Sequence, residues 1–259
     1  MWGIDVKNVT KKVKTSDGKS ELIFENFNLQ VKESEVVGIF GPNGCGKTTL
    51  LNMIAGIVKP DLGEILIFGE KPGRKSIAYI FQDYRNSLFP WLTVKDNILF
   101  PLSLKKMKRK AIQEKLDCML DTSNIPFDLD KYPYQLSGGQ QQYISILRGL
   151  ISDPIAMLID EPFSALDYSN SLWLMEKMAE ILKSMSIPAI IVAHDLDHLM
   201  CTAERICFLS EKPTSVVLEK LIDSDNPKRQ CRLDNSLFKE AKQELTNLYS
   251  RKGLAYGWG

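Results

Sequence analysis

Long apolar runs, paired cysteines and an excess of charge of either sign are all missing from this sequence of 259 residues. No apolar run approaches the ~20 residues that a membrane-spanning helix needs. The stretch 1–14 is polar and charged, so no signal peptide is expected. The 33 Lys and Arg side chains nearly balance the 32 Asp and Glu, and the net charge of +1 gives no reason to expect nucleic acid as the main partner. The sequence therefore predicts a soluble protein, which leaves attachment to a membrane complex open.

The cysteines are scattered along the chain. They include no C-x-x-C pair, which predicts reduced thiols rather than a disulfide framework or a zinc site. Cys45 stands out because a helix is expected to begin just after it, and the field of a helix N-terminus lowers the pKa of a thiol. The simpler interpretation is a small residue that fits a tight loop. The five are Cys45, Cys118, Cys201, Cys207 and Cys231.

A glycine-rich loop lies between an apolar strand, 35–40, and an expected helix that starts at Lys47. The segment GPNGCGKTT fits the phosphate-binding pattern G-x-x-x-x-G-K-[ST], in which glycines let consecutive N–H groups point at an anion. Lys47 can reach the β- and γ-phosphates, the Thr48 hydroxyl can bind Mg²⁺, and the helix N-terminus adds partial positive charge. We therefore predict that this loop binds a nucleoside triphosphate. Its residues are Gly41, Pro42, Asn43, Gly44, Cys45, Gly46, Lys47, Thr48 and Thr49.

Two adjacent carboxylates end a second apolar strand, MLIDEP, at 157–162. Asp160 at the carboxyl end of that strand can hold Mg²⁺ beside Thr48. Glu161 can orient or deprotonate the water that attacks the γ-phosphate. Two acidic residues at a solvent-facing strand end are the alternative, which the phosphate-binding loop makes less attractive.

A second anion site is indicated by LSGGQ, where a serine and two glycines precede a helix. Backbone donors, a hydroxyl and a helix N-terminus together suit an anion. One phosphate loop does not need a second such site in the same chain. Two copies meeting head to tail, however, would each close this segment over the other copy's ATP, which predicts an ATP-dependent dimer. The residues concerned are Ser137, Gly138, Gly139 and Gln140.

The order of elements predicts an α/β fold. Two alternating runs within 2–31 predict an antiparallel hairpin, and strands alternating with helices predict a mostly parallel sheet covered on both faces. The predicted domain of 1–225 has a core of 1–83 and 151–225 and an inserted helical lobe of 84–150. The tail, 226–259, is predicted to carry one amphipathic helix with Leu237, Ala241, Leu245 and Leu248 on one face.

At this point residues 4–217 resemble the ATP-binding subunits of ABC transporters. Six motifs arrive in that family's order: GPNGCGKTT, Gln82 in IFQD, LSGGQ, MLIDEP, SALD at 164–167, and His194 in VAHD. The resemblance implies a P-loop NTPase (RecA-like) core. It also implies that Gln82 reaches Mg²⁺ and the γ-phosphate, that Asp167 joins the two sites across the dimer, and that His194 holds the γ-phosphate and positions Glu161.

Three positions depart from the family pattern. The aromatic residue that usually stacks on adenine is replaced by Val13. Because base–aromatic stacking is worth ~1–3 kcal/mol, its loss would weaken ATP binding unless another ring substitutes. Tyr143 stands where an arginine is usual, which would change packing or charge near the start of its helix. Ala193 stands where threonine or serine is frequent, with little expected effect.

The stretch 81–102 is most similar to importer ATPases for nitrate, sulfonate, taurine or bicarbonate. The expected partners are transmembrane permease subunits docking near Gln82–Trp91, a second copy of the ATPase, and an extracytoplasmic solute-binding protein. The aromatics Tyr84, Phe89 and Trp91 would anchor the permease or else pack internally. The expected cofactors are ATP and Mg²⁺, and the expected location is the cytoplasmic face of the membrane. The alternatives are a non-transport ABC ATPase and a regulatory nucleotide-binding module.

Overall fold

The computed structural model describes most of the chain, and the elements below lie within that part. The described residues are 1–15, 18–73, 76–82, 87–105, 107–123, 125–222, 240, 242–244 and 246–247. The helix predicted around Leu237 to Leu248 falls on positions that are largely outside them. Among the described residues, no helix combines the length and the apolar character needed to cross a membrane.

The N-terminal β-layer is antiparallel and has the strand order β2-β1-β4. The predicted hairpin is confirmed, while β4 joins it across the far edge of β1, which the sequence pattern did not indicate. Apolar side chains such as Ile4, Phe24 and Ile65 point from this layer into the core. The strands are β1 (Trp2–Lys14), β2 (Ser20–Lys32) and β4 (Leu62–Ile67).

The core sheet comprises, within the described ranges, strands in the order β5-β6-β7-β3-β8-β9. Neighbours from β5 to β8 are parallel, and β9 runs antiparallel to β8. Every residue of β3, β6 and β7 is buried, as expected for parallel strands covered on both faces. The strands are β3 (Val36–Phe40), β5 (Ile77–Ile80), β6 (Ala156–Asp160), β7 (Ala189–Val192), β8 (Arg205–Leu209) and β9 (Val216–Leu221).

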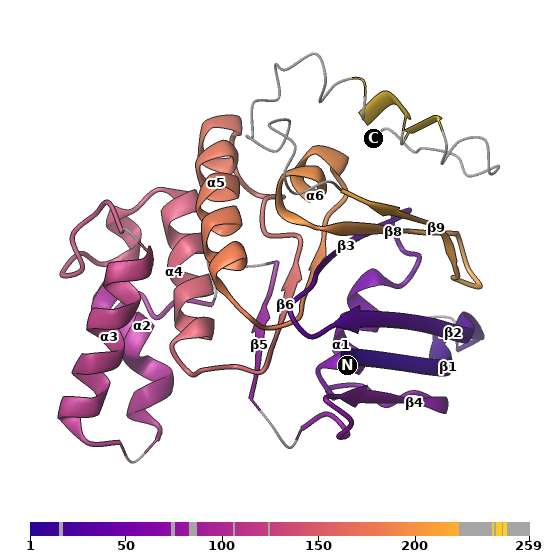
Figure 1. Cartoon of the computed structure of the whole chain (residues 1–259), viewed down its shortest axis with the longest axis horizontal. Coiled ribbons are helices and arrows are strands. Elements are labelled where there is room, and N and C mark those ends of the chain that lie inside the picture. The colour runs from indigo at the N-terminus through magenta and orange to yellow at the C-terminus, as the bar shows by residue number, and fades with distance from the viewer. Residues whose placement is uncertain are drawn as a thin grey trace.

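Each face of the core sheet has its own apolar cluster. In β6, Met157 and Ile159 pack with helices α5 (Tyr168–Ser184) and α6 (Leu196–Thr202), whereas Ala156 and Leu158 pack with α1 (Lys47–Ile54) and the β-layer. Alternate residues of one strand therefore enter opposite clusters. The result is a layered α/β arrangement, with the β-layer and α1 on one side of the sheet and α5 and α6 on the other (Figure 1).

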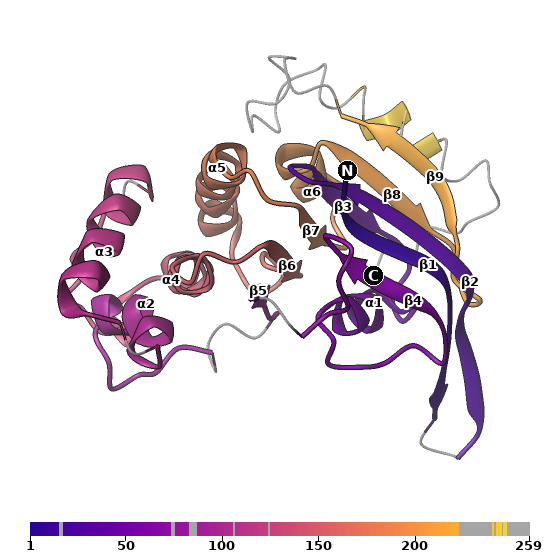
Figure 2. The same ribbon diagram turned by 60° about the horizontal axis from the view of Figure 1, so that its bottom comes forward.

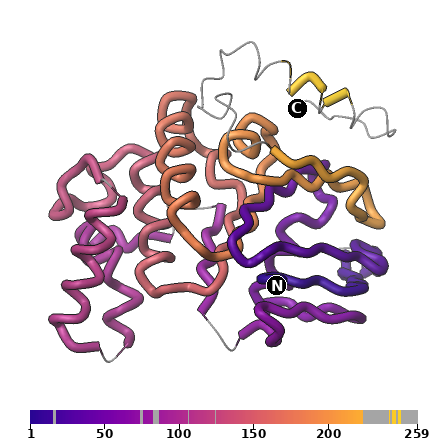
Figure 3. Tube along the Cα trace, in the orientation of Figure 1, coloured from indigo at the N-terminus to yellow at the C-terminus, as the bar shows by residue number. Residues whose placement is uncertain are grey.

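Helices α2, α3 and α4 lie to one side of the core, beyond β5 and β6 (Figure 2). The chain leaves the sheet after β5, passes through these helices and returns at β6, as the trace in Figure 3 shows. Their bounds are α2 (Val94–Ser103), α3 (Arg109–Ser123) and α4 (Gly138–Leu150), with a short 3₁₀ helix η1 (Pro133–Gln135) before α4.

Tyr143 of α4 is fully buried and contacts two neighbouring helices, α3 and α5. Its hydroxyl donates to the carbonyl of Ser123 at the end of α3, at 2.5 Å, and its ring meets Trp173 of α5 edge-on at 5.4 Å. The tyrosine that replaces the usual arginine here therefore changes packing, because its aromatic ring fills the space where α3, α4 and α5 meet.

Tyr143→Phe should lower the free energy of unfolding by about 1 kcal/mol, because it leaves the Ser123 carbonyl without this donor while keeping the ring. Urea denaturation measures the change. The matched control is Tyr134→Phe, whose side chain is 71% exposed and which should have little effect. Equal stability of Tyr143→Phe and the parent would contradict this role for the hydroxyl.

Arg205 on β8 joins three strands through one partly buried guanidinium. It pairs with Glu35 at 2.7 Å and with Glu219 of β9 at 2.8 Å, and it donates to the Gln30 carbonyl of β2. Burial acts to raise the pKa of Glu35, but the bonds from Arg205 and the Lys32 N–H outweigh it and lower that pKa. Because the folded pKa lies below the unfolded one, Glu35 contributes stability above the unfolded pKa and loses it as the pH falls through the folded pKa.

Arg205→Met should lower the free energy of unfolding at pH 7 by about 3–5 kcal/mol, because Glu35 is left buried and unpaired. The deficit should shrink at acidic pH, because protonation of Glu35 removes the buried charge that Arg205 no longer pairs. Urea denaturation at the two pH values measures both. Lys212→Met breaks a more exposed pair with Glu21 and should cost at most about 1 kcal/mol. A deficit independent of pH would contradict the assigned role of Glu35.

Candidate functional site

The carboxyl ends of three adjacent strands gather the candidate residues. In the sheet register, Ile39 of β3 and Asp160 of β6 both lie opposite Val192 of β7. The glycine-rich loop follows β3, Glu161 follows β6, and His194 follows β7, so all three enter the same edge of the sheet. Segments more than 100 residues apart in sequence thus form one site.

The loop between β3 and α1 depends on Gly46 in two ways. Gly46 precedes α1 with φ of 113°, a left-handed conformation that side chains rarely adopt. A Cβ there would also lie 2.5 Å from Ile23 Cγ2 and 3.0 Å from Phe24 Cζ, both of β2. The β-layer therefore packs directly beneath the loop, and only glycine fits this contact.

Lys47 begins α1 and folds its side chain back under the loop. Its ammonium group donates to the carbonyls of Gly41, at 2.8 Å, and Pro42, at 3.0 Å. The residue is only 7% exposed. A cation held at the N-terminus of a helix, beneath N–H groups of a glycine-rich turn, forms an electropositive cradle for an anion.

Cys45 does not have the lowered pKa that its place before a helix suggested. The residue is 2% exposed, and burial raises the pKa of its thiol despite the charge of Lys47. Its carbonyl accepts a hydrogen bond from the Thr214 hydroxyl. The idea of an activated thiol was wrong because desolvation outweighs the helix field, and the simpler interpretation of a small, fitting residue is the one the structure supports.

Asp160 is buried at the end of β6, at 4% exposure, beside Thr48 of α1. Burial raises the pKa of its carboxyl, with the charge of Glu161 adding to the increase and the hydrogen bond with Thr48 opposing it. Within the described part of the chain, its Oδ1 atom has no hydrogen-bond partner. A buried carboxylate oxygen without a partner is costly unless a ligand compensates it.

Glu161 and His194 form a close polar contact at the strand ends. The His194 Nδ1 atom lies 2.5 Å from the Glu161 Oε2 atom, with Glu161 13% and His194 52% exposed. The backbone of Glu161 is left-handed, with φ of 48°, and its N–H donates to the Val192 carbonyl at 2.9 Å. A non-glycine residue in this conformation stores strain, which is common at functional sites.

Gln82 lies just after β5 and reaches the segment that follows Glu161. Its Nε2 atom donates to the Ser164 hydroxyl at 3.3 Å, and that hydroxyl donates to the Glu161 carbonyl at 3.0 Å. Ser164 thus connects an exposed glutamine with the strained glutamate. The neighbouring residues 83–86, including Tyr84, lie outside the described residues.

The LSGGQ residues at the N-terminus of α4 and Asp167 at the N-terminus of α5 form a second group. The Ser137 side chain caps α4 by accepting a hydrogen bond from the Gln140 N–H, and the Ser137 N–H donates to Gln140 Oε1 at 3.0 Å, which completes a capping box. Asp167 caps α5. Asn170 lies between the two caps and was not among the predicted site residues. The sequence feature that could have indicated it is a carboxamide side chain three residues after Asp167, the N-cap of α5.

Val13 lies in β1, opposite Glu21 of β2, and is 39% exposed. No aromatic ring therefore stands at the expected adenine position itself. Ala193 is buried, and its N–H donates to the Ile39 carbonyl.

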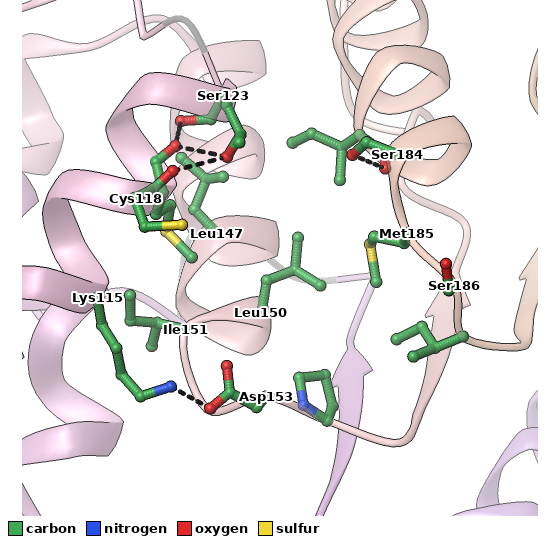
Figure 4. A pocket seen from close by; sticks show the side chains of 15 residues that line it. Lys115, Cys118, Ser123, Leu147, Leu150, Ile151, Asp153, Ser184, Met185 and Ser186 are labelled. Carbon is green, nitrogen blue, oxygen red and sulfur yellow. Dashed lines mark hydrogen bonds and ion pairs between the residues drawn. The ribbon is translucent and has the colours of Figure 1, made fainter.

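A separate apolar cavity of about 420 Å³ lies between α3, α4 and α5 (Figure 4). Leu147, Leu150 and Met185 line it, and a Lys115–Asp153 ion pair closes one end. None of the candidate site residues is among those lining it. It is therefore distinct from the site at the strand ends.

Comparisons with known proteins agree on one family. The sequence profile of the ABC transporter family matches residues 24–164, more than half of the chain. An aliphatic sulfonates import ATP-binding protein of Bacillus cereus is 37% identical over 235 residues, 90% of each chain. A bicarbonate transport ATP-binding protein of Synechococcus elongatus is 36% identical over 89% of this chain and 35% of its own length.

Solved structures give the same answer for the fold. A dimer of a bacterial ABC transporter cassette is 31% identical, with a TM-score of 0.71 over 85% of this chain and 99% of its own. A dimeric ATP-binding cassette in a post-hydrolysis state, bound to ADP and phosphate, is 30% identical with a TM-score of 0.70. On these matches, and on the site at the ends of β3, β6 and β7, the chain belongs to the ABC transporter family and is an ATP-binding ATPase.

Proposed function

We propose that this chain is the ATPase subunit of an importer, in which two copies close head to tail over two ATP molecules and drive separate transmembrane subunits. The single observation that carries the proposal is the convergence of Lys47, Asp160, Glu161 and His194 at one edge of the core sheet. The family membership and the import proteins among the relatives support it.

The phosphates of ATP would lie on the loop of Gly41 to Thr49. The electropositive cradle described above favours an anion, and Lys47 would exchange its bonds to the Gly41 and Pro42 carbonyls for phosphate oxygens. That exchange replaces neutral acceptors with charged ones, which form stronger hydrogen bonds with an ammonium. Binding would therefore be strongest at the phosphate end of the nucleotide.

The residues present fit Mg²⁺, which prefers oxygen ligands. The buried Oδ1 atom of Asp160 needs a ligand, and the Thr48 hydroxyl is hydrogen-bonded to the same carboxylate. Thr48, Asp160 and Gln82 would hold the ion, directly or through water. When bound, the ion neutralises negative charge on the phosphates.

Glu161 would act as the general base. Its carboxylate would accept a proton from the attacking water, and His194, at 2.5 Å, would fix the direction of that carboxylate and contact the γ-phosphate. The left-handed backbone of Glu161 points the side chain away from the line of the strand. Because Gln82 is hydrogen-bonded to Ser164, a change in its position on ligand binding would be passed to the segment after Glu161.

The second copy would complete each site. Ser137, Gly138, Gly139 and Gln140 of one chain would face the γ-phosphate on the other, because a helix N-terminus that begins with a serine and two glycines suits an anion. Asp167 would lie at the contact between the two sites. The dimeric cassettes among the solved relatives support this arrangement.

The membrane subunits would dock near Gln82 to Trp91. Trp91 is 71% exposed and is the better anchor. Phe89 packs internally, because it contacts Phe100 at 4.4 Å and lies under the Arg148 guanidinium. The system would be peripheral to the cytoplasmic face of the membrane and would include a solute-binding protein. A solute of the sulfonate or bicarbonate type fits the relatives named above.

A regulatory nucleotide-binding module is the second candidate, because Val13 leaves adenine without its usual ring. Steady-state phosphate release decides between the two, since a regulatory module would show none. The proposed domain division, a core of 1–83 and 151–225 with a helical lobe of 84–150, applies to both.

Glu161→Gln should retain ATP binding, lose turnover by roughly 100-fold or more, and accumulate an ATP-bound dimer, because the amide cannot accept the proton. Phosphate release and size-exclusion chromatography with ATP measure the two effects. Glu180→Gln, on the exposed pair with Lys177, is the matched control and should leave turnover unchanged. Normal hydrolysis by Glu161→Gln would exclude this residue as the base.

Val13→Tyr should tighten ATP binding by roughly tenfold, because a stacked base contributes ~1–3 kcal/mol. Val13→Leu enlarges the side chain without a ring and serves as the control. Equilibrium titration with ATP measures both. If the tyrosine and leucine variants bind ATP equally, Val13 is not the adenine position.

A further inference from the structure

Asn170 joins the caps of two helices through the two ends of its carboxamide. Its Nδ2 atom donates to Asp167 Oδ2 at 2.5 Å, and its Oδ1 atom accepts from the Ser137 hydroxyl at 2.8 Å. The Asn170 N–H also donates to Asp167 Oδ1 at 3.0 Å. The carboxamide therefore lies between the cap of α5 and the cap of α4.

The orientation of this carboxamide is determined by chemistry. Hydrogen bonds from Asn170 lower the pKa of Asp167, so Asp167 is ionised and can only accept hydrogen bonds. Asn170 must then turn its NH₂ group toward Asp167 and its oxygen toward Ser137. Because that oxygen can only accept, the Ser137 hydroxyl has to donate to it. The hydroxyl proton of Ser137 thus has a fixed direction in the single chain.

Close packing also holds the start of α4 against the start of α5. A Cβ at Gly139 would lie 3.0 Å from the Asn170 carbonyl oxygen and 3.2 Å from the Asn170 Cβ. The second glycine of LSGGQ is thus pressed against the first turn of α5. Movement of α4 relative to α5 would disturb both this contact and the carboxamide bridge.

We propose that Asn170 is a positioning residue that bridges the Ser137 hydroxyl and the Asp167 carboxylate in the single chain, so that both caps are already in place when the second copy arrives. This inference rests on the proposed function, in which Ser137 faces the γ-phosphate of the other copy. A phosphate oxygen accepts hydrogen bonds, so the Ser137 hydroxyl turns from Asn170 to the phosphate when the dimer closes. Asn170 keeps its two bonds to Asp167 during that exchange and maintains the position of both caps.

The test measures dimer formation by the full-length chain carrying Glu161→Gln, which the proposed function expects to dimerise with ATP. Adding Asn170→Ala should raise the ATP concentration for half-maximal dimerisation about tenfold, as expected for lost hydrogen bonds to a charged group. Size-exclusion chromatography across an ATP series measures this. Titration with ADP, which reports on the loop of a single chain, should be unchanged, and this separates positioning from general damage.

Two further variants test the contacts of Asn170 with Asp167 and with Ser137 separately. Asn170→Asp keeps an acceptor for Ser137 but places a second carboxylate against Asp167, so it should raise the required ATP at least as much as Asn170→Ala. Ser137→Ala should also raise it, and adding Asn170→Ala to Ser137→Ala should cause a smaller further change, because both act through one bond. Ser169→Ala, an exposed position on the same turn, should match the parent.

The outcomes are distinguishable. If the Glu161→Gln parent does not dimerise with ATP, the proposed function fails and this inference fails with it. If the parent dimerises and either Asn170→Ala or Asn170→Asp matches it, the proposed function stands and the positioning role is wrong. Full additivity of Ser137→Ala and Asn170→Ala would also overturn the link, as would a weakened ADP titration for Asn170→Ala.

Discussion

Parallel pairing of β3, β6 and β7 is the constraint on which the rest of the structure depends. Strands that run in the same direction bring their carboxyl ends to one edge, and the register opposite Val192 aligns the exits of β3 and β6. Helices must return the chain between such strands, which explains why α1, α5 and α6 cover the sheet. The site is therefore a consequence of topology. Its loop, carboxylates and histidine meet because parallel strands end together.

The same topology leaves the site in two parts. The loop, Asp160, Glu161 and His194 belong to the strand ends, whereas Ser137 and Asp167 belong to the N-termini of α4 and α5. Charge also differs between the parts. Lys47 and the N-terminus of α1 hold positive charge beneath the glycine-rich loop, while the second part places the neutral Ser137 hydroxyl, bonded to Asn170, near the Asp167 carboxylate. An arrangement of this kind suits a nucleotide that binds to one chain first and is then covered by another.

Burial decided several features that sequence patterns described only in part. Cys45 sits before a helix, as predicted, yet desolvation raises its pKa because the β-layer covers it. Tyr143 departs from the family pattern, and its effect is on packing because it lies at the junction of three helices. Among the proposed aromatic anchors, Phe89 is partly buried against Phe100 while Trp91 is exposed, which their places two residues apart in the sequence could not distinguish.

Local pattern determined much of this protein by itself. Alternating apolar residues predicted the N-terminal hairpin, and continuous apolar runs predicted β3 and β6 to within two residues, because such patterns depend on neighbouring residues. The motifs, taken in order along the chain, predicted the family. The tertiary structure alone decided how distant segments meet: β4 on the edge of β1, Arg205 between three strands, Asp160 beside Thr48, and Asn170 between two helix caps. These contacts join residues far apart in sequence, and no periodicity encodes them. They arise only when packed layers bring those residues within hydrogen-bonding distance.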